Sequence, residues 1–166
     1  FEDSASTVSN AEKIHAYRNY LGLMKRELST TFTKGGQTVT RSLNDDKVCT
    51  DINGDKFSLA GTSLTLVRNV GIHMMTEIVR NLDDSPIPEG ILDAMVTSLI
   101  ALHDIKIKAN SKKGSLYIVK PKLHGPEEVK FTMQLFELVE KALSLKTNTL
   151  KIGVMDEERR TTLNLK

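Results

Sequence analysis

Hydrophobic residues recur at three- and four-residue steps over residues 10–28, and this spacing predicts an amphipathic helix. Ser9 or Asn10 can cap its start, because either side chain can accept a hydrogen bond from an N–H group of the first turn. The stripe expected to face the core consists of Ile14, Tyr17, Leu21, Met24 and Leu28.

Residues 30–59 have a different pattern, in which threonine and valine alternate with polar residues. Turns are marked by Lys34-Gly35-Gly36 and by Asn53-Gly54, whose residue types supply the positive φ angles of tight hairpins. The stretch is therefore predicted to form small antiparallel strands inserted between other elements.

Three later stretches are apolar and rich in branched residues, as expected of buried strands: residues 63–70, 115–119 and 150–155. Helical spacing lies between them, over residues 90–104 and again from Pro126 onward. The expected buried stripes are Ile91, Met95, Leu99 and Leu102 in the first helix, and Val129, Met133, Phe136, Val139 and Leu143 in the second.

The order strand, helix, strand, helix, strand is typical of βαβ units and predicts a parallel sheet of the α/β class. Pro126 suits a first helical position, and Glu127 and Glu128 suit the positive first turn of that helix. The alternation does not separate an open doubly wound sheet from part of a barrel.

Composition excludes several classes of protein. The chain has 166 residues and a formal net charge of +2, with basic and acidic residues mixed along most of it, which argues against a nucleic-acid or membrane partner. No apolar run approaches the about 18 residues that a membrane-spanning helix needs. Cys49 is the single cysteine, so an intrachain disulfide is excluded and a cytoplasmic location is expected. Glycine-rich nucleotide motifs and the His-Glu-x-x-His zinc motif are absent from the sequence.

Charged residues follow the last predicted strand directly, in the run Asp156-Glu157-Glu158-Arg159-Arg160. Functional groups of α/β folds gather at the carboxyl ends of parallel strands, and a carboxylate there can hold a hard cation such as Mg²⁺. The alternative is a solvated turn in which Glu157 and Glu158 pair with nearby arginines or lysines.

Arg68 stands at the end of another predicted buried strand. A buried guanidinium is costly unless it is paired, so either a carboxylate or an anionic ligand is expected opposite it. A structural ion pair and a role in catalysis both remain open on these grounds.

Lysines are frequent in one stretch that the turn residues Asn110-Ser111 interrupt. Its members are Lys106, Lys108, Lys112, Lys113, Lys120 and Lys122. The stretch is either a solvated loop or a surface for an anionic partner, and the second possibility would describe a non-catalytic α/β interaction module.

Five ordered stretches of the chain closely resemble the malate synthase family, in its long G form. They are Phe1-Glu2-Asp3-Ser4, Ala16 to Met24, Leu66-Val67-Arg68-Asn69-Val70-Gly71, Tyr117 to Glu128, and Met155 to Lys166. The resemblance implies a (β/α)₈ TIM barrel with an inserted small α/β piece. Residues 1–28 would be a barrel strand end and helix, residues 29–62 the antiparallel insertion, and residues 63–166 a βαβαβ part of the barrel.

The resemblance also implies an activity, namely the Mg²⁺-dependent condensation of acetyl-CoA with glyoxylate, followed by hydrolysis to malate and CoA, in the glyoxylate bypass. Arg68 matches the arginine that contacts glyoxylate and stabilises the enolate. Glu157 matches a metal ligand that is also close to glyoxylate, and Glu2 a glutamate near the metal. Ser4 and Arg41 match contacts to acetyl-CoA.

The family is several times longer than this chain, so the resemblance implies an internal segment. The second metal ligand and the aspartate base are then expected beyond Lys166, and the isolated segment is expected to be inactive and to self-associate. A Mg²⁺-dependent lyase of the citryl-CoA type is the alternative enzyme.

Overall fold

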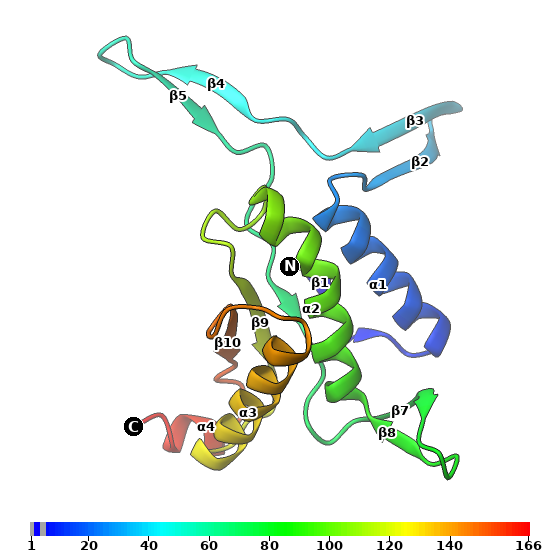
Figure 1. The fold of residues 1–166 in the computed structure, drawn as a ribbon. Coiled ribbons are helices and arrows are strands. Elements are labelled where there is room, and N and C mark those ends of the chain that lie inside the picture. The colour runs from blue at the N-terminus through cyan, green and yellow to red at the C-terminus, as the bar shows by residue number, and fades with distance from the viewer. Residues whose placement is uncertain (1, 4–5) are drawn as a thin grey trace.

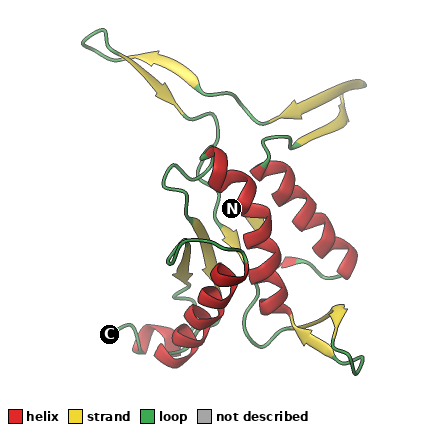
Figure 2. Ribbon diagram, viewed as in Figure 1, coloured by secondary structure: helices red, strands yellow, loops and turns green. Residues whose placement is uncertain are grey.

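Four parallel strands form the central sheet of the computed structural model, which describes residues 2–3 and 6–166, with side chains from residue 6 onward. The strands are β1 (Glu2–Asp3), β6 (Val67–Arg68), β9 (Leu116–Lys120) and β10 (Leu150–Val154), in the order β1-β6-β9-β10. Three long helices, α1 (Asn10–Met24), α2 (Glu89–Ile107) and α3 (Pro126–Ala142), pack on one side of the sheet (Figures 1 and 2). The predicted parallel α/β arrangement is confirmed, and within the described residues the sheet stays open.

Helix α1 begins as predicted. Ser9 accepts a hydrogen bond from the Glu12 N–H, and the Glu12 side chain accepts one from the Ser9 N–H, which is a reciprocal capping box. The helix ends at Met24 rather than at residue 28, because Arg26 adopts a left-handed φ of 62°. Leu28 therefore lies outside the helix.

The buried face of α1 agrees with the predicted stripe in part, since Met24 is buried and Tyr17 and Leu21 pack against the core. Tyr20 and Met24 are fully buried together with Lys13, whereas Ile14 is exposed. Hydrophobic spacing did not indicate that Lys13 is buried, because its position in the interior depends on acidic partners from α2.

The inserted antiparallel strands are present as two hairpins. The first pairs β2 (Ser29–Lys34) with β3 (Gln37–Ser42), and Gly35 and Gly36 take positive φ angles at its turn. The second pairs β4 (Lys47–Thr50) with β5 (Lys56–Leu59), with Gly54 at its turn. Both hairpins extend away from the sheet, beyond the end of α1 (Figure 1).

The strand predicted over residues 63–70 is much shorter than expected. Only Val67 and Arg68 pair with neighbouring strands, and Leu64 is exposed. A further hairpin follows that the sequence did not predict, made of β7 (Met75–Arg80) and β8 (Pro86–Pro88). Its turn lies between Arg80 and Pro86.

Helix α2 has an unusual buried face. Ile91 and Leu99, expected in the core, are exposed, while the buried residues are small or polar except for Ile100. They are Gly90, Asp93, Ala94, Thr97, Ser98, Ile100, Ala101 and Asp104. Small side chains allow α2 to approach α1, α3 and β9 closely, so this face is selected by packing and not by hydrophobicity.

Helix α3 follows the prediction more closely, since Pro126 stands in its first turn and Phe136 and Val139 are buried, although Met133 is exposed. A short helix that was not predicted, α4 (Arg159–Leu163), comes after β10. The hydrophobic core lies between the helices and the sheet, and includes Val67, Ile118, Ala94, Ala101, Phe136 and Leu150.

Candidate functional site

The carboxyl ends of β6, β9 and β10 meet at one edge of the sheet, because the three strands are parallel. Arg68 lies in register with Val119, and Val119 with Gly153, so these three residues project to the same face. Their predecessors Val67 and Ile118 project to the opposite face and are fully buried in the core. Arg68 therefore faces away from the helices, as a half-buried side chain at the predicted functional edge.

Glu157 lies at the same edge, just after β10. Its Oε1 accepts a hydrogen bond of 2.9 Å from the backbone N–H of Lys122, which follows β9. The sequence therefore correctly indicated that carboxylates after β10 lie beside the end of a neighbouring strand, although it did not indicate the partner.

The two flanking carboxylates have structural partners. Glu158 forms an ion pair of 2.9 Å with the Lys122 ammonium, which lowers the pKa of Glu158 and raises the pKa of Lys122. Asp156 accepts a hydrogen bond of 2.6 Å from the hydroxyl of Thr162 in α4. The solvated ion pair that the sequence suggested for this turn is thus formed by Glu158. Glu157 instead accepts a hydrogen bond from an uncharged backbone N–H.

The residues at this edge fit a hard cation only in part. The exposed carboxylate of Glu157 is a suitable oxygen donor, and its orientation is set by the Lys122 N–H. Within residues 6–166, no group of three or more His, Cys, Asp and Glu side chains gathers as a metal site. A metal held by Glu157 would therefore need further ligands.

The other predicted site residues lie elsewhere. Ser4 falls outside the described residues, and Glu2 is described only through its backbone pairing with Val67. Arg41 is exposed on β3, with its guanidinium 5.5 Å from the ring centroid of Phe32. The hairpin that carries Arg41 lies at the end of the molecule away from α4, so the structure does not bring Arg41 beside Arg68 and Glu157 (Figure 1).

The lysine-rich stretch does not form one basic surface. Lys106, Lys108, Lys112 and Lys113 are exposed around the end of α2 and the loop before β9. Lys120 is buried at the other end of β9, and Lys122 is paired with Glu158. Because β9 separates the two groups, the structure gives little support to a continuous anion-binding face.

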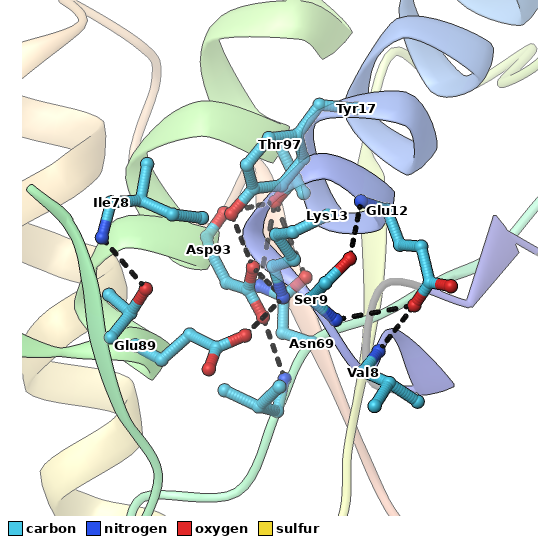
Figure 3. Close-up of polar contacts among 12 residues, drawn as sticks. Val8, Ser9, Glu12, Lys13, Tyr17, Asn69, Ile78, Glu89, Asp93 and Thr97 are labelled. Carbon is cyan, nitrogen blue, oxygen red and sulfur yellow. Dashed lines mark hydrogen bonds and ion pairs between the residues drawn. The ribbon is translucent and has the colours of Figure 1, made fainter.

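A buried network of charged and polar side chains lies between α1 and α2, and sequence reasoning missed it (Figure 3). The Lys13 ammonium is 2.7 Å from carboxylate oxygens of both Glu89 and Asp93. The Tyr17 hydroxyl donates to Asp93 at 2.6 Å, and burial, together with that carboxylate, strongly raises the pKa of Tyr17. The one available signal was the position of Asp93 between the apolar residues Ile91, Leu92, Ala94 and Met95, because a carboxylate buried among such residues requires a partner.

The network continues to the segment that follows Arg68. Asp93 accepts a hydrogen bond of 2.8 Å from the Val70 N–H, and the Lys120 ammonium donates to the Val70 carbonyl oxygen at 2.5 Å. Burial lowers the pKa of Lys120 from 10.5 to about 8, even though Asp93 opposes that shift.

The fold defines an α/β protein with charged side chains at the carboxyl edge of a parallel sheet. The family model for the malate synthase TIM barrel domain matches residues 64–166. The chain therefore belongs to the malate synthase family, which confirms the resemblance found in the sequence.

Curated relatives extend the similarity to the whole chain. Malate synthase G of Halalkalibacterium halodurans is 56% identical over 168 residues, which cover 99% of this chain and 23% of that protein. The malate synthase G proteins of Corynebacterium efficiens and Corynebacterium glutamicum are 51% and 49% identical over equal lengths. The chain thus spans less than a quarter of the length of these relatives. In the described part of the chain, no helix is both long enough and apolar enough to cross a membrane.

Proposed function

We propose that this chain forms part of a malate synthase that condenses acetyl-CoA with glyoxylate and releases malate and CoA. The observation that carries the proposal is the placement of Arg68 and Glu157 at the carboxyl edge of one parallel sheet, in a chain of this family. A guanidinium and a carboxylate at this edge can serve an anionic substrate and a divalent cation side by side.

Arg68 would bind the glyoxylate carboxylate and stabilise negative charge on the enolate that forms when acetyl-CoA loses a methyl proton. Its planar, forked donors suit both tasks. The enolate carbon then attacks the glyoxylate aldehyde, and hydrolysis of the resulting thioester yields malate and CoA. The base that removes the methyl proton is expected in a segment beyond Lys166.

Glu157 would hold Mg²⁺, which supplies Lewis-acid polarisation of the aldehyde when it is bound. Glu157 suits this role better than its neighbours, because Glu158 is engaged by an ammonium and Asp156 by a hydroxyl. The second carboxylate ligand is expected from the same later segment as the base, and Glu2 would act near the metal through bound water.

Other assignments rest on the family resemblance. Ser4 and Arg41 would contact acetyl-CoA, residues 1–28 and 63–166 would belong to a (β/α)₈ barrel, and residues 29–62 would be its inserted piece. The four parallel strands and the two projecting hairpins support this division. A cytoplasmic location would suit the single, unpaired Cys49.

The test is thiol release from acetyl-CoA by the full-length protein, measured with and without glyoxylate and after removal of divalent metal with a chelator. We expect release that needs both glyoxylate and Mg²⁺. Cleavage of citryl-CoA to acetyl-CoA and oxaloacetate, without any need for glyoxylate, would indicate the alternative lyase. Calorimetry that shows binding of a polyanion, and of neither Mg²⁺ nor glyoxylate, would favour the non-catalytic module.

A further inference from the structure

The peptide unit of Val70, two residues after Arg68, is held on both sides by buried charged side chains. Asp93 of α2 accepts the Val70 N–H at 2.8 Å, and the ammonium of Lys120 at the end of β9 donates to the Val70 carbonyl at 2.5 Å. Asp93 is 0% exposed and Lys120 is 1% exposed. Charge-assisted hydrogen bonds away from water are the strong ones, so this clamp restricts the conformation of the segment.

Both charges are costly to bury, so each needs compensating contacts in the interior. Asp93 is compensated by Lys13 at 2.7 Å and by the Tyr17 hydroxyl at 2.6 Å, which brings α1 into the clamp (Figure 3). Gly90 leaves the space for the Lys120 ammonium, because a Cβ at that position would lie 2.8 Å from Nζ. Four residues of α1 and α2, together with Lys120 at a strand end, thus surround one backbone peptide.

The clamp matters because β6 is so short. Only Val67 and Arg68 belong to the strand, and its ladder ends where the Asn69 N–H donates to the Val119 carbonyl at 3.1 Å. A longer strand would fix the direction of Arg68 through its backbone hydrogen bonds. Here the segment beyond Asn69 is fixed by side chains instead.

We propose that Asp93 and Lys120 are positioning residues for Arg68, and that their hold on the Val70 peptide keeps the guanidinium aimed at the anionic substrate. This inference rests on the proposed function, because Arg68 is assigned there to glyoxylate. Both side chains are buried on the side of the sheet that the helices cover. Both act through the backbone of the segment that follows β6.

The test compares two buried aspartates of the same helix in the full-length protein. Asp93→Asn weakens the clamp at the carboxyl edge of the sheet. Asp104→Asn is the matched control, since Asp104 is 3% exposed and accepts the N–H groups of Asn110 and Ser111 before β9 begins, at the opposite edge. Thermal midpoint, kcat and the KM for glyoxylate are measured for both variants.

We expect both substitutions to lower the thermal midpoint, and only Asp93→Asn to lower kcat/KM for glyoxylate, by about tenfold or more, because small misplacements of a substrate-binding group are costly in rate. Lys120→Met should act in the same direction, with a smaller effect on stability, since an apolar side chain of similar length is well tolerated in a buried site. If Asp93→Asn does not fold, Lys120→Met decides the question.

Coupling to Arg68 separates positioning from general loss of structure. In an Arg68→Lys background, Asp93→Asn should have little further effect on kcat/KM, because the group being positioned is already altered. Additive losses, or unchanged kinetics in both clamp variants, would overturn the inference. A wild-type protein inactive with acetyl-CoA and glyoxylate would instead overturn the proposed function, so the two failures are distinct.

Discussion

The backbone N–H of Lys122 donates to Oε1 of Glu157 at 2.9 Å, which joins the segment after β9 to the segment after β10. Lys122 makes this contact from a left-handed conformation, with φ at 54°. Its ammonium meanwhile pairs with Glu158. One residue thus gives two adjacent carboxylates different surroundings, and only Glu158 is neutralised by a cation.

This difference predicts which carboxylate binds metal. Glu157→Gln should weaken Mg²⁺ binding by the full-length protein far more than Glu158→Gln, because the amide removes the anionic charge at the metal. Calorimetric titration of both variants with Mg²⁺ measures the effect, and Glu158→Gln is the matched control. Equal affinities would show that Glu157 is the wrong carboxylate.

Arg68→Lys should lose most of its turnover while the fold survives. Lysine keeps the charge but not the forked donors, and loss of one such contact commonly lowers the rate by about 10² to 10³. Steady-state kinetics and circular dichroism on the full-length protein check the two halves of this prediction. Turnover close to that of the wild type would remove Arg68 from the mechanism.

Gly90→Ala should fail to stabilise the protein, although alanine is usually favoured over glycine within helices by about 1 kcal/mol. The new Cβ would lie 2.8 Å from the Lys120 ammonium, which must then move away from Val70. Gly22→Ala in α1 is the control, because its nearest neighbours would be at 3.4 Å. A thermal midpoint that rises equally in both variants would contradict the predicted close contact between the new Cβ and the Lys120 ammonium.

The titration of Lys120 predicts a particular dependence of stability on pH. Its folded-state pKa of about 8 lies below the ordinary 10.5. Between these values the unfolded chain binds the proton and the folded chain does not, so stability rises with pH, by at most about 1.4 kcal/mol per pH unit from this group.

Lys120→Met lacks this contribution. The thermal midpoint of the wild type should therefore rise relative to that of Lys120→Met between pH 8 and about 9.5. The upper limit is chosen because tyrosines of the unfolded chain ionise above it. The difference between the wild type and Lys122→Met should stay constant over this interval, because the ordinary pKa of 10.5 already lies above it and the ion pair with Glu158 raises the pKa of Lys122 further. A constant difference between wild type and Lys120→Met would mean that Lys120 titrates elsewhere.

The chain expressed by itself should self-associate and be inactive with acetyl-CoA and glyoxylate. Within the described residues, the outer edges of β1 and β10 are unpaired, and such edges favour pairing with another chain. An apolar hollow of about 510 Å³ also opens between α3 and α4, lined in part by Val129, Met133 and Val154. Light scattering that shows a monomer, together with malate formation, would contradict this prediction.

Local patterns predicted much of the secondary structure correctly. The cap at Ser9, the glycine turns of the two hairpins and Pro126 at the start of α3 all act within a few residues of the chain. The alternation of strands and helices then required a parallel sheet. Because strand ends gather at one edge of such a sheet, Arg68 and Glu157 could be placed there in advance.

The tertiary structure alone decided which residues are buried and how the edge is held. Ile91 and Leu99 are exposed while Asp93 is buried, since the small residues of α2 permit a closer approach than its large ones. Asp93 meets Lys13 and Val70 across 80 and 23 positions of sequence, respectively. Periodicity describes only neighbours along the chain, whereas the compensation of a buried charge depends on which distant groups the fold brings within hydrogen-bonding distance.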